Sequence, residues 1–348
     1  MIYLKFAVGY QIDERNLFVP EIISRRDKVK EVYFAYGDFA NGRGRMAESD
    51  EERLFSDLEK LHDAGIDLNL LLNANCYGAD SLARAFFEKI GDTVDWFREN
   101  FGLTSVTTTS PVIAKFVKNN FSSLEIRASV NMGIGTTDAA EYLGDTFDSY
   151  YLAREANRNL NVIKEMSSFC RGNGKKLYML ANSGCLNHCP AHTFHDNLVS
   201  HENEIMKRDN AFTFKSLCRE RISSPETMYS LLRDTNFVRP EDIASGLFDE
   251  YFNMAKLATR VNPRPLQILI AYTSGKYIGN LAELLEPDHS SAIYPYVLEN
   301  TLIPSDFTAK VMTCDKKCGK CNYCKEIFKK SLNKTNEGVF IYADKQND

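Results

Sequence analysis

The chain has 348 residues, of which 44% are hydrophobic and 26% charged, and its formal net charge is −5. This length and composition predict a substantial buried core and no low-complexity tract. The acidic balance gives no support for a broad nucleic-acid-binding face, and no segment is long and apolar enough to predict a bilayer span.

The N-terminal stretch does not resemble a signal peptide. Lys5 interrupts its apolar run, and Asp13, Glu14 and Arg15 follow soon afterwards. We therefore expect a cytoplasmic protein. In a reducing compartment clustered cysteines hold metal more often than each other, so a disulfide framework is not expected.

Short β-branched or aromatic runs alternate with longer amphipathic runs, a pattern typical of repeated βα units. Strands are expected at Ile2–Val8, Glu31–Tyr36, Asp67–Leu72, Ser105–Thr109, Glu125–Val130, Ser149–Leu152, Lys176–Leu180 and Tyr251–Leu257. Eight such units predict an α/β fold, a (β/α)8 TIM-like barrel with a small cysteine-rich C-terminal extension. An open doubly wound sheet is the alternative, with less support because no Gly-rich phosphate loop follows the first strand.

Helices are expected between these strands. Glu51–Ala64 carries leucines on one face, and Ala79–Asn100 places apolar residues on one face, namely Leu82, Phe86, Ile90 and Phe97. The segment Arg239-Pro240-Glu241-Asp242 is interpreted as a turn before the eighth strand.

In a (β/α)8 barrel, chemistry lies at the C-terminal ends of the strands. The residues that follow the expected strands are mostly amides, cations and thiols, which suit an anionic ligand better than a carboxylate-pair hydrolase. The candidate substrate-binding residues are Asn41, Arg43, Asn73, Asn131 and Arg260, and the candidate catalytic residues are His192, His195, Arg154 and Lys256. A salt bridge at the barrel rim is the plainer role for each cation, with Glu155 or Asp145 as the partner of Arg154.

A first cysteine group follows the seventh strand. Cys185 and Cys189 lie four residues apart on one loop, and Cys218 can approach from the next loop, so these thiols predict a metal or iron–sulfur site. His192 and His195 are candidate ligands, donors to cluster sulfur or proton carriers, and each can instead be a surface or cap residue.

A second cysteine group is Cys314, Cys318, Cys321 and Cys324, four thiols within eleven residues. This spacing predicts a zinc ion or a second iron–sulfur cluster, and it is closer to a cluster loop than to two separated zinc knuckles. Seven lysines and only two acids lie between residues 314 and 334, so this segment is a candidate phosphate-contacting surface or a solvated one.

Two cysteines lie outside these groups. Cys76 follows the third strand and is either a further ligand or a small buried hydrophobe, and Cys170 is expected in the core. A hydrolytic nucleophile is the alternative use of a thiol, with His192 or His195 as its base. Ligation by metal would remove a thiolate's freedom to attack, which argues against that use.

The order of several motifs resembles the collagenase-like U32 peptidase family over residues 1–285. These motifs are Gly37, Asn41 and Arg43 after the second strand, Asn73 after the third, Asn-Ser-Gly-Cys at 182–185, Lys-Ser-Leu-Cys at 215–218, Arg-Pro-Glu-Asp at 239–242, and Lys256 with Arg260. The resemblance implies a TIM-like barrel over residues 1–285, followed by an extension over residues 286–348 that carries the four-cysteine motif.

The resemblance also implies a function. Family members include oxygen-independent hydroxylases that modify RNA pyrimidines or an aromatic ring, with prephenate as donor and a 4Fe-4S cluster held by four cysteines. Cys185 and Cys218 fall at family ligand positions, while the family's usual further cysteine is missing. The fourth ligand is Cys76, a histidine, a C-terminal cysteine or a small molecule.

We therefore expect an iron–sulfur enzyme of hydroxylase type that binds a small anionic donor such as prephenate, with RNA or a protein as a further partner. Arg43, Arg154, Lys256 and Arg260 are the groups expected to hold that donor. The alternatives are a peptidase of the collagenase-like family, with a thiol or metal-bound water as nucleophile, and a non-catalytic iron–sulfur subunit.

Overall fold

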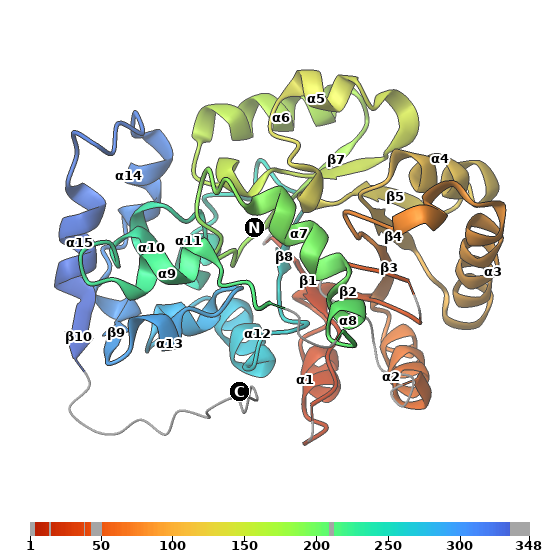
Figure 1. Ribbon diagram of the computed structural model, residues 1–348, viewed down its shortest axis with the longest axis horizontal. Coiled ribbons are helices and arrows are strands. Elements are labelled where there is room, and N and C mark those ends of the chain that lie inside the picture. The colour runs from red at the N-terminus through yellow and green to blue at the C-terminus, as the bar shows by residue number, and fades with distance from the viewer. Residues whose placement is uncertain (1–3, 14, 38, 43–50, 209–211, 335–348) are drawn as a thin grey trace.

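The computed structural model describes residues 4–13, 15–37, 39–42, 51–208 and 212–334. Within these residues eight parallel strands pair in chain order, and the first strand pairs with the eighth to close a barrel (Figure 1). The predicted (β/α)8 TIM-like architecture is therefore confirmed.

The barrel strands are short and almost wholly buried. They are β1 (Phe6–Gly9), β2 (Val29–Phe34), β3 (Asp67–Leu72), β4 (Ser105–Thr108), β5 (Glu125–Ala128), β6 (Ser149–Tyr151), β7 (Lys176–Leu180) and β8 (Met254–Leu257). β3 and β7 have the bounds expected from the sequence. β1 begins later than Ile2, because Leu4 and Lys5 are outside the strand and the first three residues lie outside the described part of the chain.

Helices cover the barrel and its C-terminal side. They are α1 (Phe18–Ser24), α2 (Glu51–Asp63), α3 (Arg84–Phe101), α4 (Pro111–Asn120), α5 (Thr137–Glu141), α6 (Leu160–Gly172), α7 (His192–Ser200), α8 (Glu202–Ile205), α9 (Leu217–Ser223), α10 (Ser230–Arg233), α11 (Pro240–Ala244), α12 (Pro265–Ser274), α13 (Ser290–Ile293), α14 (Phe307–Thr313) and α15 (Tyr323–Ser331). Short 3-10 helices are η2 (Gly78–Leu82), η3 (Val130–Met132), η4 (Gly144–Thr146), η5 (Arg154–Ala156), η6 (Leu281–Leu284) and η7 (Asn300–Leu302).

Two local expectations are wrong. The helix expected over Ala79–Asn100 is split, because Ala83 is extended between η2 and α3, and this breaks the helical period that would have buried Leu82. Leu82 is 75% exposed. The segment 239–242 is not a free turn but the start of α11, where Pro240 occupies the first turn and Asp242 accepts from the Arg239 backbone N–H.

Local chemistry explains where the well-formed helices begin and end. Ser110 caps α4 by accepting a hydrogen bond from the Ile113 N–H at 3.3 Å, and Pro111 occupies the first turn. Gly102 ends α3 in the left-handed conformation, with φ of 65°. These signals set the lengths of the helices that return the chain to the bottom of the barrel.

Polar side chains fill the lower part of the barrel interior. Arg127 on β5 donates to Glu31 on β2 at 2.7 Å and to Glu125 at 2.9 Å, and Asn69 on β3 donates to Glu31 at 2.9 Å. Burial opposes the charge of the Arg127 guanidinium, but the neighbouring carboxylates outweigh burial and raise its pKa, so the group stays charged. These paired polar side chains therefore form the lower layer of the barrel interior, below the C-terminal ends of the strands.

The C-terminal part folds back against the barrel helices. β9 (Tyr296–Leu298) and β10 (Leu332–Lys334) pair antiparallel, α15 packs against α10, and α14 packs against α6 (Figure 1). The division of the chain at residue 285 stays a prediction. Among the described residues no helix is long and apolar enough to cross a membrane.

Candidate functional site at the barrel mouth

A small cavity of about 70 Å³ lies at the C-terminal ends of the strands. Its lining includes these residues expected from the sequence: Asn73, Asn131, Arg154, Cys185, Lys256 and Arg260. They come from the ends of five strands or from the loops that follow them, and the end of β8 supplies both Lys256 and Arg260. The barrel topology therefore brings together cations, amides and one thiol that are scattered along the chain.

Lys256 on β8 is the most perturbed of these groups. Its ammonium nitrogen lies over the Tyr33 ring, 3.8 Å from the ring centroid, and 5.2 Å from the centroid of the Tyr151 ring. Burial, followed by the nearby Arg260 charge, lowers the pKa of Lys256 to about 7. A lysine in this state can both accept and donate a proton near neutral pH.

Two amide groups converge beside Gly42. A methyl group added to Gly42 would lie 3.0 Å from Asn131 Nδ2 and 3.2 Å from Asn73 Nδ2. Asn73 is held in place because its Oδ1 accepts from the Gly42 N–H at 3.2 Å. Glycine thus leaves space in front of two N–H donors, which is the geometry that binds an oxyanion or a carbonyl oxygen.

Arg154 connects the mouth to α7. It donates to Asn131 Oδ1, contacts His192 Nε2, and lies 3.9 Å from Asp196 Oδ2. His192 Nε2 lies 3.3 Å from the same Asp196 oxygen. The rim salt bridge considered from the sequence therefore exists, with Asp196 as partner in place of Glu155 or Asp145. It orients Asn131 and His192 around the guanidinium.

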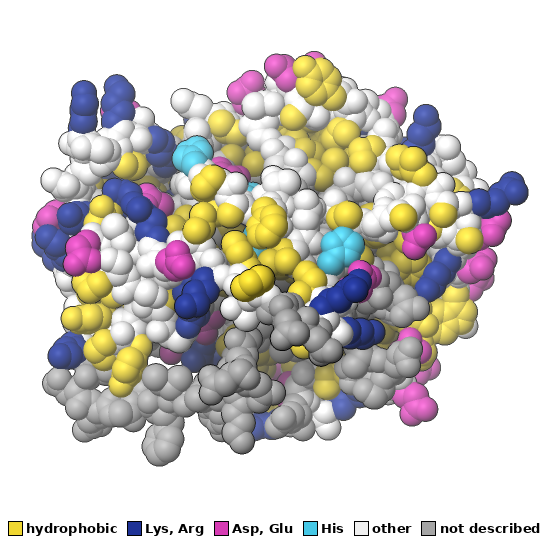
Figure 2. Space-filling view, viewed as in Figure 1, with side chains coloured by type: hydrophobic (Ala, Val, Ile, Leu, Met, Phe, Trp, Pro, Cys, Tyr) yellow, Lys and Arg dark blue, Asp and Glu magenta, His cyan; other side chains and the backbone are white. Residues whose placement is uncertain are grey.

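α7 extends from the loop after β7 to the loop after β3. The Asn75 N–H donates to Ser200 Oγ at 3.1 Å and its side chain donates to Asp196 at 3.4 Å. His195 packs against Phe214 with the two rings tilted by 45° and their centroids 5.3 Å apart. Apolar side chains gather at the centre of the face in Figure 2. Phe194 on α7 is 58% exposed and packs edge-on against Phe214, with ring centroids 5.3 Å apart.

Three polar residues that line the mouth, Tyr33, Ser183 and Glu286, were not among the candidate site residues predicted from the sequence. Tyr33 precedes the end of its strand, so it was not counted among the residues that follow strands. The buried Ser183 hydroxyl has no hydrogen-bond partner among the described residues. Glu286 reaches the rim because it bridges Ser183 in parallel and donates its N–H to Asn182 O at 2.9 Å. No local pattern links Glu286 to the barrel.

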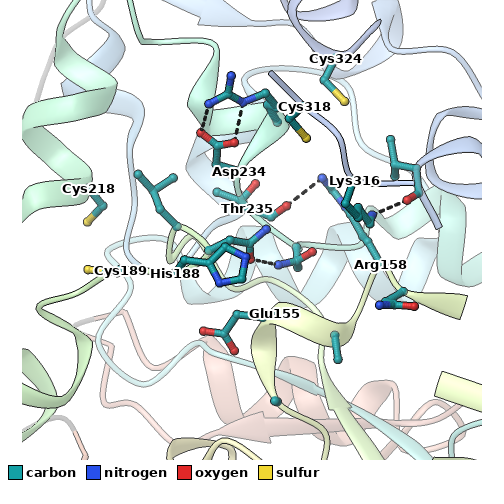
Figure 3. Close-up of a pocket in the computed structure, with 18 of the residues that line it drawn as sticks. Glu155, Arg158, His188, Cys189, Cys218, Asp234, Thr235, Lys316, Cys318 and Cys324 are labelled. Atoms are coloured by element: carbon teal, nitrogen blue, oxygen red, sulfur yellow. Dashed lines mark hydrogen bonds and ion pairs between the residues drawn. The ribbon is translucent and has the colours of Figure 1, made fainter. Parts of the chain in front are cut away.

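A second, larger cavity of about 1020 Å³ lies next to the mouth. Figure 3 shows residues that line it, among them thiols from both cysteine groups, and the thiols of the full lining are Cys189, Cys218, Cys314, Cys318 and Cys324. The loop after β7, α9, the loop before α11 and the segment 314–324 all contribute walls. The two cysteine groups, far apart in sequence, therefore share one cavity.

Within this cavity the thiols remain two groups. Cys218 interacts electrostatically with Cys185 and Cys189, and Figure 3 shows Cys189 and Cys218 on one side with Cys318 and Cys324 on the other. Burial raises the pKa of Cys218, and it raises the pKa of Cys324 to about 11. These two thiols are therefore protonated and unreactive at neutral pH in the absence of metal.

The remaining candidates lie elsewhere. Asn41 is buried and donates to Phe39 O, Cys76 lines neither cavity and accepts from the Gly78 N–H, and Cys321 is exposed on the C-terminal loop. Arg43 lies outside the described residues. Cys170 is buried in α6, as expected.

An iron–sulfur cluster requires several suitable donors close to one point. Cysteine thiolates are the correct donor type. However, in the part of the chain that the structure describes, no three His, Cys, Asp or Glu side chains converge closely enough to hold a metal ion. The thiols therefore do not form a ready-made cluster site, and no chemical step below passes through a cluster.

No protein-family model matches the chain. A relative named "Uncharacterized protease MJ1657", from Methanocaldococcus jannaschii, is 28% identical over 315 residues, which is 87% of this chain and 88% of the relative. The solved structure of the U32 peptidase Mk0906 matches with a TM-score of 0.51 at 15% identity, covering 73% of this chain and 91% of that one. The resemblance to the U32 peptidase family is confirmed. The likeness to the solved U32 structure extends to the fold of the barrel.

Proposed function

We propose that the chain is a peptidase that cleaves short anionic peptides at the barrel mouth, with Cys185 as nucleophile and Lys256 as its base. The observation that carries this proposal is that Cys185 and the buried Lys256 line the same small cavity. A protease and a U32 peptidase among the similar proteins support it further. It differs from the peptidase considered from the sequence, in which a histidine was the base.

The lysine replaces histidine for a structural reason. His192 contacts Arg154 and Asp196, and His195 packs against the Phe214 ring in a tilted arrangement. Neither histidine is among the residues that line the mouth cavity, whereas Lys256 is. With a pKa of about 7, Lys256 is partly neutral at physiological pH and can take a proton from a thiol.

The proposed reaction has two halves. Lys256 Nζ accepts the Cys185 thiol proton as sulfur attacks the peptide carbonyl carbon, and the protonated lysine then gives this proton to the departing amine. A thioester remains on Cys185. In the second half, neutral Lys256 takes a proton from water as the hydroxide oxygen attacks the thioester carbon. The carbon–sulfur bond then breaks, the carboxylic acid product leaves, and Lys256 returns its proton to the Cys185 sulfur, which restores the thiol and the neutral lysine.

The amides beside Gly42 would stabilise the intermediate. Asn73 Nδ2 and Asn131 Nδ2 point into the space that Gly42 leaves open, so they can donate to the oxyanion that forms in each half-reaction. Arg154 positions Asn131 through its hydrogen bond to Oδ1, which leaves the amide N–H groups facing that space.

The charge and size of the mouth suggest the substrate class. Arg154, Lys256 and Arg260 surround a cavity of about 70 Å³, which has room for only a few non-hydrogen atoms. A peptide whose carboxylate lies close to the scissile bond would place that carboxylate against the guanidinium groups. We therefore propose short peptides cleaved near a free C-terminal carboxylate.

The test uses the purified full chain and a mixture of short peptides, each with a free or an amidated C-terminus, analysed by mass spectrometry. Cleavage of the free-carboxylate peptides is expected, and Cys185→Ala and Lys256→Met should each lower kcat/KM by about 1000-fold or more. Cys170→Ala is the matched control, because that thiol is buried in α6 away from both cavities. Full activity of Cys185→Ala would exclude the thiol mechanism.

A second candidate function is an oxygen-independent hydroxylase with a 4Fe-4S cluster. It is favoured by the proximity of Cys218 to Cys185 and Cys189 at the rim of a cationic mouth. A bound cluster would supply redox chemistry, and Arg154, Lys256 and Arg260 would bind a small anionic donor such as prephenate. Metal binding would have to draw the thiols together, since they do not converge as described.

Anaerobic purification separates the two candidates. The hydroxylase requires iron and sulfide in the protein and a broad absorption band near the edge of the visible range, both lost in Cys189→Ala. The peptidase requires cleavage that persists in iron-free protein and in the presence of a chelator. RNA or a protein as a further partner of this site stays a prediction.

A further inference from the structure

Arg154 and Glu155 are consecutive residues of η5 that carry opposite charges and line different cavities. Arg154 lines the small cavity of the mouth, whereas Glu155 lines the larger cavity beside it. The loop after β7 is divided in the same way, since Cys185 lines the mouth and Leu186 lines the larger cavity. The same two segments of chain therefore border both cavities, and one of them carries the proposed nucleophile.

The larger cavity has the space that the mouth lacks. The mouth cavity of about 70 Å³ holds only a few non-hydrogen atoms, so it cannot take both sides of a scissile peptide bond. The larger cavity of about 1020 Å³ would be roughly 10 Å across if it were compact, which is the length of about three extended residues. Its lining mixes apolar side chains such as Leu186 and Leu217 with polar ones, as is usual in ligand sites. The acyl side of a peptide held at Cys185 can therefore extend into it.

The cations of the larger cavity already have partners within the protein. Arg233 donates to the Asp234 carboxylate at 2.6 and 2.7 Å, and Arg221 lies 3.8 Å from the same carboxylate. Arg158 donates to three backbone carbonyl oxygens at 2.9–3.0 Å, and Lys316 donates to one backbone carbonyl oxygen. These groups hold the walls of the cavity together.

The Glu155 carboxylate differs from these groups. Glu155 is half-buried, and among the described residues it forms no hydrogen bond or ion pair. Figure 3 shows Glu155 and Lys316 on different sides of the cavity. A partly buried carboxylate without a partner is costly, and an ammonium group can donate charge-assisted hydrogen bonds to it. Glu155 is therefore a binding position for a positively charged group of a ligand in the larger cavity.

We propose that the larger cavity binds the acyl part of the peptide substrate, and that Glu155 pairs with an ammonium group of that part. In a short peptide this group is the free N-terminus. The inference rests on the peptidase proposed above and specifies its substrate. The mouth offers three cations and one carboxylate, that of Glu286, to the C-terminal end of the peptide. A peptide with both ends free thus places its carboxylate in the mouth and its ammonium group beside Glu155, with the scissile carbonyl at Cys185.

The pairing would select peptides by length as well as by charge. The distance between Cys185 and Glu155 is set by the scaffold, because both residues lie at the ends of neighbouring barrel strands, β7 and β6. A peptide much longer than the cavity carries its N-terminus past Glu155 into solvent. Short peptides with a free N-terminus are therefore the expected substrates, and Glu155 is a specificity residue that does not touch the reacting atoms.

The first test measures peptide binding by calorimetry to the full chain with Cys185→Ala, in which the proposed cleavage cannot occur. The ligands are the tripeptide Ala-Ala-Gly, its N-acetylated form and acetyl-Lys-Ala-Gly. Acetylation of Ala-Ala-Gly should weaken binding by about 10- to 100-fold, the usual effect of losing a charged hydrogen bond. Recovery of affinity with acetyl-Lys-Ala-Gly would show that a lysine side chain can supply the ammonium group. Equal Kd values for all three peptides would overturn the proposal.

The second test assigns this effect to one side chain. When Glu155→Gln is added to Cys185→Ala, the free and the acetylated tripeptide should bind with similar affinity, because the amide keeps the shape of the side chain and removes its charge. Glu220→Gln is the matched control, since Glu220 lines the same cavity but is exposed on α9. The control should keep the full effect of acetylation. An effect of the same size in Glu155→Gln would overturn the role of Glu155.

A comparison with cleavage by the wild-type chain separates this inference from the peptidase itself. Binding that depends on Glu155, without cleavage of any short peptide, would support the cavity assignment and overturn the peptidase. Cleavage at the same kcat/KM with and without N-acetylation would support the peptidase and overturn the cavity assignment. Failure of Ala-Ala-Gly to bind would also overturn the cavity assignment.

Discussion

The ammonium nitrogen of Lys256 lies 3.8 Å from the centroid of the Tyr33 ring, at the top of the barrel interior. The negative face of the ring favours the charged lysine. Burial and the nearby Arg260 favour the neutral form more strongly, so the pKa falls to about 7. Near pH 7 roughly half of the molecules therefore carry a neutral Lys256.

Peptidase activity should rise with pH through this value. The proposed base must be neutral to accept the thiol proton, so kcat/KM is expected to increase between about pH 6 and pH 8 with a midpoint near 7. Steady-state kinetics over this range will measure it. In Lys256→Met the residual activity should lack this inflection, and a wild-type profile that falls across the same range would contradict the assignment.

Lys256 should also make stability depend on pH. Its pKa is lower in the folded chain than the ordinary value of 10.5, so between about pH 7 and pH 10 the unfolded chain binds more protons and the free energy of unfolding rises with pH. Lys256→Met removes this cost of burying an amine. We expect the variant to be more stable at pH 7 by about 2–5 kcal/mol.

Urea denaturation at pH 7 and pH 9 will test this dependence. The advantage of the Met variant should shrink by about half at pH 9, because the free energy needed to remove the proton from a lysine of ordinary pKa falls as the pH rises. A stability difference that is the same at both pH values would show that packing, and not the titration of Lys256, determines the effect.

Gly42→Ala should impair catalysis without impairing the fold. The added methyl group would lie 3.0 Å from Asn131 Nδ2 and 3.2 Å from Asn73 Nδ2, and would occupy the space proposed for the oxyanion. We expect kcat to fall by about 100-fold, the size seen when oxyanion donors are lost. Gly172→Ala is the control, because nothing lies within 4 Å of its new methyl group. Equal kcat values would remove the amide pair from the mechanism.

Gly9→Ala should destabilise the barrel. Its methyl group would lie 2.7 Å from the Tyr33 ring, and Tyr33 cannot withdraw freely because its hydroxyl donates to Leu257 O at 2.7 Å. Overpacking of this kind costs about 1–3 kcal/mol. Thermal denaturation should show a lower Tm for Gly9→Ala than for Gly172→Ala. Equal Tm values would mean that the ring has room to move.

Part of the mouth could be predicted from the sequence because several of its polar residues follow recognisable strands. Asn73 follows β3, Arg154 follows β6 and Lys256 lies at the end of β8, so a single rule about barrel topology brings them together. β3 itself was predicted with its observed bounds, since its buried run of leucines is bounded by Gly65 before it and by asparagines after it.

Other relationships depend on contacts between distant segments. Cys189 and Cys318 share a cavity only because α14 packs against α6 and α15 against α10, and no periodicity in either segment specifies that packing. The amide pair beside Gly42 depends on side-chain orientation, which sequence spacing cannot predict. The contact between His192 and Arg154 likewise depends on where α7 lies relative to the barrel, which the sequence alone does not specify.

Ser183 and Glu286 form a bridge at the rim of the mouth, so this rim combines two segments that are synthesised at different times. All eight described barrel strands, and the loop with Cys185, have been synthesised by the time residue 257 leaves the ribosome. Glu286 follows almost thirty residues later. A nascent chain in that interval has every strand of the barrel but lacks one wall of its reactive centre, so completion of the rim is separated in time from synthesis of the scaffold.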